Sequence, residues 1–189
     1  EEHLQMLSEI HGLNYVTVVP HNVIGIGQRY YDPFRNVVGI MINRAAQAKN
    51  LIIYGDGEQK RSFSDVRDCI IAVERIMSSD REDLCGQVFN IGPDDNEMSI
   101  KELATLVTQL SEIYIKFEYY PDRPREVKDA YCSSDKIRKE FNYNAATPAK
   151  QTIADMVNWI KPIKREFEYH LPLELITDQT PKTWTDKLI

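Results

Sequence analysis

Apolar residues recur at three- and four-residue spacing in several separate segments of the chain, and each of these segments predicts a helix. The first segment covers residues 1–10. Ser99 and Glu102 form a capping-box sequence, which predicts the N-terminus of another helix. Beyond the first, helices are therefore expected near residues 37–46, 66–77, 100–110, 135–141 and 148–160.

Short runs of apolar and β-branched residues between these helices predict strands. Residues 14–19 (NYVTVV) are apolar almost throughout, which is typical of a strand buried on both faces of a parallel sheet. A helix that leads into such a strand indicates a mixed α/β fold, with a remnant of a parallel sheet first and a smaller α+β portion after it. The tail after Lys164 has no sustained period but is rich in apolar residues, so we expect it to wrap around its own domain or a partner. Further strands are expected at 51–54, 60–63, 88–91 and 113–119.

The composition narrows the class of protein. Apolar residues make up 42% of the 189 residues, but no apolar run approaches the roughly 20 residues that cross a bilayer, so no membrane partner is expected. A net charge of −6 argues against nucleic acid as a partner. The first residues lack the features of a signal peptide, and the three cysteines are widely spaced, so we expect reduced thiols in a cytoplasmic protein. The four histidines form no metal-binding pair, and no metal is predicted.

Two loops in the first third of the chain carry groups that could hold a charged ligand. Residues 21–29 follow the predicted buried strand, at the carboxyl end where open α/β sheets bind ligands. Their Asn22 amide suits a sugar hydroxyl or a phosphate oxygen, although Asn and Gly can equally build a turn. Residues 55–63 contain Arg61, whose planar guanidinium could bind a diphosphate or could lie exposed on a hairpin.

A third loop, residues 121–126, carries Arg123 and Arg125 around a proline. These side chains could form the other half of a phosphate site, or they could be part of a solvated charge run. Neither Gly-x-Gly sequence of the chain completes a dinucleotide fingerprint, and no arrangement of nucleophile, acid and base is present. The residues alone therefore indicate a domain for an anionic ligand and define no reaction.

In their order along the chain, these loops resemble the carboxyl-terminal half of the NAD-dependent nucleotide-sugar epimerase/dehydratase family, the extended branch of the short-chain dehydrogenase/reductases. The resemblance is greatest to UDP-galactose 4-epimerase-like and UDP-glucose 4-epimerase-like members. Residues 54–68 (YGDGEQKRSFSDVRD) are similar to the family's pattern Y-G-D-G-x-Q-x-R-x-F-x-x-V-x-D, the most specific match. Residues 18–28 (VVPHNVIGIGQ) resemble its R-P-x-N-V-Y-G-P segment, and Arg123 to Glu126 resemble R-P-G-D/E.

The resemblance implies a Rossmann-type parallel sheet, of which this chain holds the C-terminal remnant, and a small α+β substrate-binding domain. It also implies NAD as cofactor and a UDP-sugar or other nucleotide-sugar as substrate. The arginines that match Arg61 and Arg123 bind the diphosphate in the family, and the aromatic that matches Tyr54 lies against the base. The substrate-binding positions that it implies are Asn22, Asn36, Val37, Tyr54, Arg61, Val88, Arg123 and Glu126.

Among these positions, the resemblance places Val88 near the ribose or base and Asn36 at the start of the helix over the diphosphate. The backbone of Pro20 and His21 would lie beside the nicotinamide. The domain division that follows is an end of the NAD-binding part at 1–35, a nucleotide-sugar part at 36–162 and a C-terminal extension at 163–189.

The family's glycine fingerprint and its catalytic Tyr-x-x-x-Lys are absent from the sequence. We therefore expect a piece of a longer enzyme that binds a UDP-sugar and has no turnover by itself, with no catalytic residue assigned. The expected parent activity is UDP-hexose 4-epimerisation. A 4,6-dehydratase, a decarboxylase or a noncatalytic nucleotide-sugar binding module is the alternative. A homodimer is possible, as is common in the family.

Overall fold

The computed structural model describes residues 1–95, 97–170, 172–173 and 176–189. Every helix expected from the sequence is present, and a short additional helix lies in the C-terminal tail. The α-helices are α1 (Glu2–His11), α2 (Val37–Ala46), α3 (Val66–Met77), α4 (Ile100–Ser111), α5 (Asp135–Phe141), α6 (Ala149–Ile160) and α7 (Lys182–Thr185), with single 3-10 turns at Glu82–Leu84 and Lys161–Ile163.

The described strands are short, and most of their pairings are parallel. Three separate parallel pairs form, β1 with β6, β2 with β5 and β3 with β8, while β4 lies between antiparallel β7 and parallel β9. The strands are β1 (Thr17–Pro20), β2 (Val23–Ile24), β3 (Leu51–Tyr54), β4 (Lys60–Ser62), β5 (Ser64–Asp65), β6 (Val88–Ile91), β7 (Glu97–Ser99), β8 (Phe117–Tyr120) and β9 (Asp129–Ala130). The fold is α/β, as the sequence predicts.

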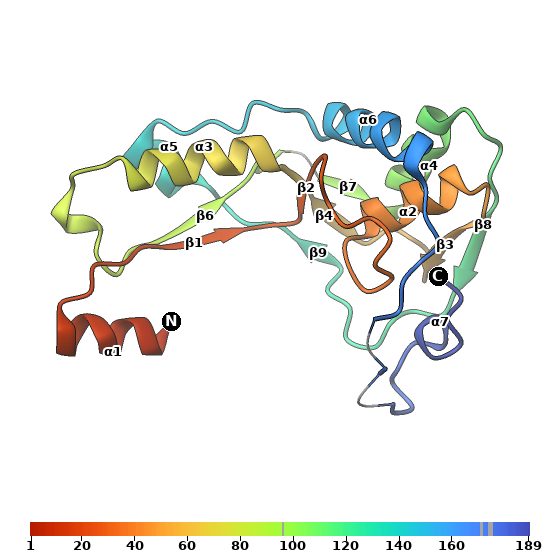
Figure 1. The fold of residues 1–189 in the computed structure, drawn as a ribbon, viewed down its shortest axis with the longest axis horizontal. Coiled ribbons are helices and arrows are strands. Elements are labelled where there is room, and N and C mark those ends of the chain that lie inside the picture. The colour runs from red at the N-terminus through yellow and green to blue at the C-terminus, as the bar shows by residue number, and fades with distance from the viewer. Residues whose placement is uncertain (96, 171, 174–175) are drawn as a thin grey trace.

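The larger hydrophobic core lies among α2, α4, α6 and β3, in the half of the molecule that also holds the C-terminus (Figure 1). The apolar stripes of the three helices meet there, and Leu51 and Ile53 of β3 are fully buried against them. The predicted capping box begins α4, because Ser99 Oγ accepts from the Glu102 amide and the Glu102 carboxylate accepts from the Ser99 amide. This core fixes the positions of α2 and β3, which carry much of the site described below.

A second core joins the β1–β6 pair to α3 and α5. Phe89 and Ile91 of β6 and Ile137 of α5 are buried in it. The prediction of a strand at 14–19 that is buried on both faces is wrong: the strand begins at Thr17, and Val19 is 41% exposed. Among the described strands β1 pairs with β6 alone, and Val18 packs against the second core while the neighbouring Val19 points to the other face and stays exposed. Helix α1 likewise has no buried residue and lies apart from both cores (Figure 1).

Three further differences concern the strands and the tail. The strand expected at 113–119 begins at Phe117, since Ile113 and Ile115 pack against the larger core from an irregular connection. The predicted strand at 60–63 ends at Ser62, and the short strands β2, β5, β7 and β9 had no counterpart in the prediction. The described parts of the tail contact their own domain through Arg165, Thr183 and Leu188, which is one of the two outcomes expected. Across the described ranges, no helix is long and apolar enough to cross a bilayer.

Candidate nucleotide-sugar site

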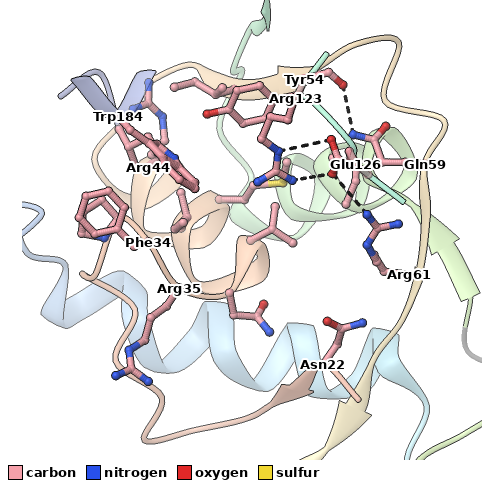
Figure 2. Close-up of a pocket in the computed structure, with 18 of the residues that line it drawn as sticks. Asn22, Phe34, Arg35, Arg44, Tyr54, Gln59, Arg61, Arg123, Glu126 and Trp184 are labelled. Carbon is pink, nitrogen blue, oxygen red and sulfur yellow. Dashed lines mark hydrogen bonds and ion pairs between the residues drawn. The ribbon is translucent and has the colours of Figure 1, made fainter. Parts of the chain in front are cut away.

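A cavity of about 250 Å³ opens beside the larger core, between the first turns of α2, strand β3 and four loops (Figure 2). The segments that reach it are far apart in the sequence: the loop after β1, the loop between β2 and α2, the loop between β3 and β4, the loop after β8, and the C-terminal tail. Its lining residues include Asn22, Phe34, Asn36, Val37, Arg44, Tyr54, Gln59, Arg61, Arg123, Glu126, Trp184 and Ile189.

Arg61 and Arg123 converge on one carboxylate at the edge of this cavity, although 62 positions separate them in the chain (123 minus 61). Arg61 Nη2 lies 3.3 Å and Arg123 Nη2 2.5 Å from the same oxygen, Glu126 Oε1. Arg123 Nε also donates to Glu126 Oε2 at 3.3 Å. Figure 2 shows both guanidinium groups pointing at the Glu126 carboxylate from different elements. Two cations that share one oxyanion in this way can also share the oxygens of a diphosphate.

The Tyr54 ring lies next to this arginine pair. The guanidinium carbon of Arg123 lies 4.7 Å from the centre of the ring, which is a cation–π distance. Burial raises the pKa of the Tyr54 hydroxyl, and a hydrogen bond to the Thr183 hydroxyl partly opposes that rise. Tyr54 is therefore a neutral, anchored aromatic that can present its ring to a flat group of a ligand.

The loop that connects Tyr54 of β3 to Arg61 of β4 is fixed by the first turn of α4. The Ile100 amide donates to the Gln59 carbonyl at 3.1 Å, and the Lys101 amide donates to the Gly57 carbonyl at 3.0 Å. The Gln59 side chain donates back to the Tyr54 carbonyl at 3.1 Å. These bonds satisfy N–H groups that the helix itself leaves free, and they hold the loop in one position against the core.

The predicted residues Asn22, Asn36 and Val37 also lie at the cavity. Asn22 has a φ of 39°, and its side-chain nitrogen donates to the Ser62 carbonyl at 2.9 Å. Asn36 caps α2, since its side-chain oxygen accepts from the Val38 amide at 2.9 Å. The structure thus brings together Asn22, Asn36, Val37, Tyr54, Arg61, Arg123 and Glu126.

The three other predicted positions lie elsewhere. Val88 is at the start of β6, paired with Thr17, and is not part of the cavity. Pro20 ends β1 at its carboxyl end and is exposed. The His21 ring lies 2.5 Å through Nδ1 from Cys132 Sγ, and its backbone carbonyl accepts from Ser64 Oγ at 2.7 Å. The roles assigned to these residues stay predictions. Within the described ranges, no group of three or more metal-ligating side chains forms.

Arg44 is a cavity residue that the sequence reasoning missed. Its side chain is buried, with Nε donating to the Asn50 carbonyl at 2.6 Å and Nη1 to the Leu188 carbonyl at 2.8 Å. Burial lowers the pKa of this guanidinium, and the nearby Glu118 carboxylate partly offsets the effect. One signal could have revealed it: Arg44 lies seven residues after Val37 and three after Met41, on the apolar stripe of the helix.

Trp184 and Ile189 were also missed, because the tail carries no periodic pattern. The Trp184 ring packs edge-on against Phe34, with ring centres 5.6 Å apart and an interplanar angle of 89°. A Trp so close to the C-terminus, in a segment rich in apolar residues, was the available signal. In Figure 2, Trp184, Arg44 and Phe34 stand together on one side of the cavity, and Arg61 stands on the other.

A cavity at the loops of an α/β fold that joins paired guanidinium groups, an aromatic ring and fixed amides has the chemistry to hold a small anionic ligand. A model of the NAD dependent epimerase/dehydratase family matches residues 1–92. Over these residues, just under half of the 189, the chain is similar to that family.

Individual proteins of known sequence or structure are similar to most of this chain. The UDP-N-acetyl-alpha-D-glucosaminuronate decarboxylase of Bacillus cytotoxicus is 29% identical over 173 residues, which cover 88% of this chain and 52% of the relative. The structure of a UDP-glucuronic acid 4-epimerase from Bacillus cereus, in complex with UDP-glucuronic acid and NAD, superposes with a TM-score of 0.77 at 22% identity, covering 86% of this chain and 50% of that one.

A UDP-N-acetylglucosamine 4-epimerase from Methanobrevibacter ruminantium M1, in complex with UDP-N-acetylmuramic acid, gives a TM-score of 0.75 at 26% identity and covers 86% of this chain and 51% of that one. The chain therefore spans about half the length of the relatives that it matches. Its fold is that of these proteins over the shared part.

Proposed function

We propose that this chain is the substrate-binding portion of an NAD-dependent nucleotide-sugar epimerase, and that the reaction is the 4-epimerisation of a UDP-hexose. The observation that carries the proposal is the convergence of Arg61 and Arg123 on one oxygen beside the Tyr54 ring. In the bound state, the diphosphate would replace the Glu126 carboxylate oxygen as the shared acceptor. The base would then lie toward Tyr54 and the hexose toward Asn22.

The arrangement supports this ligand on physical grounds. The Arg61 side chain is 17% exposed and that of Glu126 14% exposed, so the charges interact with little screening by water. Two guanidinium groups neutralise a diphosphate and fix its orientation through bidentate bonds. Binding energy from this nonreacting end of the substrate can then hold the hexose in place for reaction.

The carboxyl end of β1 offers an exposed surface on which a nicotinamide ring could pack. Pro20 is exposed and has no N–H group, while the neighbouring His21 carbonyl is already engaged by Ser64. The exposed Pro20 would therefore be the contact with NAD, which when bound supplies hydride acceptance and return at C4 of the sugar. The role of this chain is to place the hexose on that side, and no proton transfer is assigned to its residues.

Calorimetric titration with UDP tests the diphosphate site. We expect Arg61→Ala and Arg123→Ala each to weaken UDP binding by about 1–3 kcal/mol, roughly 5- to 150-fold, the cost of a lost charge-assisted hydrogen bond. Arg81→Ala is the matched control, because Arg81 is also ion-paired to carboxylates but lies in the loop after α3, away from the cavity. Unchanged UDP affinity in both cavity variants would refute the proposal.

Turnover is a separate test. The 189 residues contain no Tyr-x-x-x-Lys sequence, so we expect them to bind a UDP-sugar and to leave it unconverted. Incubation with UDP-glucose and NAD, followed by chromatography of the sugar nucleotides, measures this. Steady-state formation of the epimer by the 189-residue chain would contradict the assignment of its part in the reaction.

A decarboxylase is the second candidate, favoured by the 29% identity to the Bacillus cytotoxicus enzyme. The two reactions begin with the same kind of ligand and differ in the product. A protein that contains this chain together with the rest of the family fold would, as a decarboxylase, release carbon dioxide from a UDP-uronic acid. As an epimerase it would return an isomer of unchanged mass, so mass spectrometry of the product separates the two.

A further inference from the structure

The last nine residues of the chain are held against the cavity at both ends of their short path. At the start, the Thr183 hydroxyl forms a hydrogen bond with the Tyr54 hydroxyl, and Thr183 is 1% exposed. At the end, the buried Arg44 donates to the Leu188 carbonyl at 2.8 Å, and Tyr169 donates to the Ile189 carbonyl at 3.1 Å. Two of these anchors, Tyr54 and Arg44, are themselves lining residues of the cavity.

Trp184, which lies between these anchors, and the terminal Ile189 both line the cavity. Trp184 lies in α7, whose first turn is closed by the Trp184 amide donating to the Pro181 carbonyl at 2.9 Å. Its ring packs edge-on against Phe34, which lines the same space. The tail therefore forms part of the wall of the cavity.

The order of groups across the cavity determines which part of a ligand would meet this wall. In Figure 2, Arg61 and Asn22 lie on one side, Arg123 and the Tyr54 ring lie in the middle, and Trp184 lies on the far side. A nucleotide-sugar has its diphosphate between its sugar and its nucleoside. If the arginine pair holds the diphosphate and the hexose extends toward Asn22, the nucleoside extends past Tyr54 toward Trp184.

We propose that residues 181–189 complete the base-binding end of the site, with the Trp184 ring as the surface against which the base of the nucleotide packs. The inference rests on the proposed function, because it takes the position of the diphosphate from it. A flat base packs favourably on an indole through its π-face, and the anchored tail pays little ordering cost when it does so.

Two probes separate the base from the diphosphate. UDP carries both groups, and inorganic pyrophosphate carries the diphosphate alone. We expect Trp184→Ala and a chain ending at Thr180 to weaken UDP binding about 10-fold or more, with pyrophosphate affinity unchanged in calorimetry. Arg61→Ala should weaken both ligands. Trp184→Phe keeps an aromatic ring and should retain most of the UDP affinity, and circular dichroism of each variant checks that it is folded.

Fluorescence gives a readout in the intact chain. The sequence has two tryptophans, and Trp159→Phe leaves Trp184 as the remaining one. We expect UDP to quench Trp184 emission in this variant and pyrophosphate to leave it unchanged. Trp159 packs against Tyr30, outside the lining of the cavity, so its own emission in a Trp184→Phe variant should not respond.

Three results would overturn the inference. If UDP binds wild type and the truncated chain equally, the tail takes no part in base binding. If truncation raises UDP affinity, the tail occupies the base position and competes with the ligand. If Trp184 emission does not respond to bound UDP, the base lies elsewhere. Loss of UDP binding in Trp184→Ala with no effect of Arg61→Ala and Arg123→Ala would instead remove the diphosphate site and leave an aromatic base site.

Discussion

Asp65 connects two helices beside the site, and its replacement gives a sharp test of the structure. Its side chain is 1% exposed and caps α3, since Oδ1 accepts from the Arg67 amide at 2.7 Å. The other oxygen accepts from the buried Thr152 hydroxyl of α6 at 2.7 Å and from Arg67 Nη2 at 2.7 Å. Asp65 thus joins α3, in one core, to α6, in the other.

The expected loss follows from these bonds. Asp65→Asn keeps an oxygen that can cap α3 but removes the charge. A hydrogen bond to a charged group contributes about 1.5–3 kcal/mol, while the ion pair with Arg67 contributes less because the Arg67 side chain is 58% exposed. We expect Asp65→Asn to lower the free energy of unfolding by about 1–3 kcal/mol. Asp65→Ala should lower it further, since it also removes the cap.

The stabilisation by the ionised Asp65 is expected to decrease at acidic pH. Burial alone would raise the pKa of Asp65, but its hydrogen bonds with Arg67 and Thr152 outweigh burial and hold the pKa below the ordinary 3.8. The stabilisation by the charge is therefore complete above the unfolded-state pKa of about 4 and is lost as the pH falls through the lower folded-state value. The difference between wild type and Asp65→Asn should be constant from pH 7 to pH 5 and shrink toward pH 2.5.

Urea unfolding followed by circular dichroism measures both effects. Asp83→Asn is the matched control: Asp83 also binds an arginine through both carboxylate oxygens, but its side chain is 66% exposed. We expect the unfolding midpoint of this control to remain at the wild-type value. A midpoint for Asp65→Asn that equals that of the control, or a difference that persists undiminished at pH 2.5, would refute the reasoning.

Two further predictions concern backbone packing and thiol reactivity. A Cβ added at Gly57, where φ is 78°, would lie 2.8 Å from Ile53 Cγ2, whereas one added at Gly27, where φ is 92°, has no described atom within 4 Å. In thermal or urea unfolding, we expect Gly57→Ala to lose about 2–4 kcal/mol and Gly27→Ala about 1–2 kcal/mol, and equal losses would contradict the packing described. At pH 8, Ellman's reagent should label the exposed Cys85 first, because its hydrogen bond with Ser8 lowers the pKa of its thiol. The reagent should label Cys69 only on unfolding, because burial and, to a lesser extent, Asp68 raise the pKa of that thiol to about 11. Labelling of the two thiols at equal rates would contradict both environments.

The elements that the sequence predicts well are those whose signals are local. Residues 51–54 and 88–91 form strands with the expected bounds, and the Ser99 capping box begins α4 as expected. The predicted start of the strand at 113–119 was wrong, because the apolar residues there reflect burial and not strand structure. Ile113 and Ile115 are apolar because they pack on the core from a connection, and a run of apolar residues does not distinguish that from a strand.

The arginine pair could be predicted only by motif. From the residues alone, solvated surface positions were the better explanation for both Arg61 and Arg123, because no local rule brings two loops so distant in sequence together. The parallel pairing of β4 with β9 accomplishes this, placing Arg61 opposite Ala130, a few residues after the Arg123 loop. Strands as short as β9 (Asp129–Ala130) carry almost no sequence signal, so this part of the topology required the structure.

The position of the C-terminal tail could not be predicted from the sequence either. Its apolar content predicted packing against some surface, but which surface depends on single hydrogen bonds that no periodicity encodes: Thr183 to Tyr54, and Arg44 to the Leu188 carbonyl. Arg44 is buried on an otherwise apolar helix face, and such a guanidinium requires acceptors that the helix cannot provide. The Leu188 carbonyl supplies one of them. The need of a buried cation for acceptors therefore links the missed helix residue to the missed tail, and both lie at the end of the cavity where we place the base.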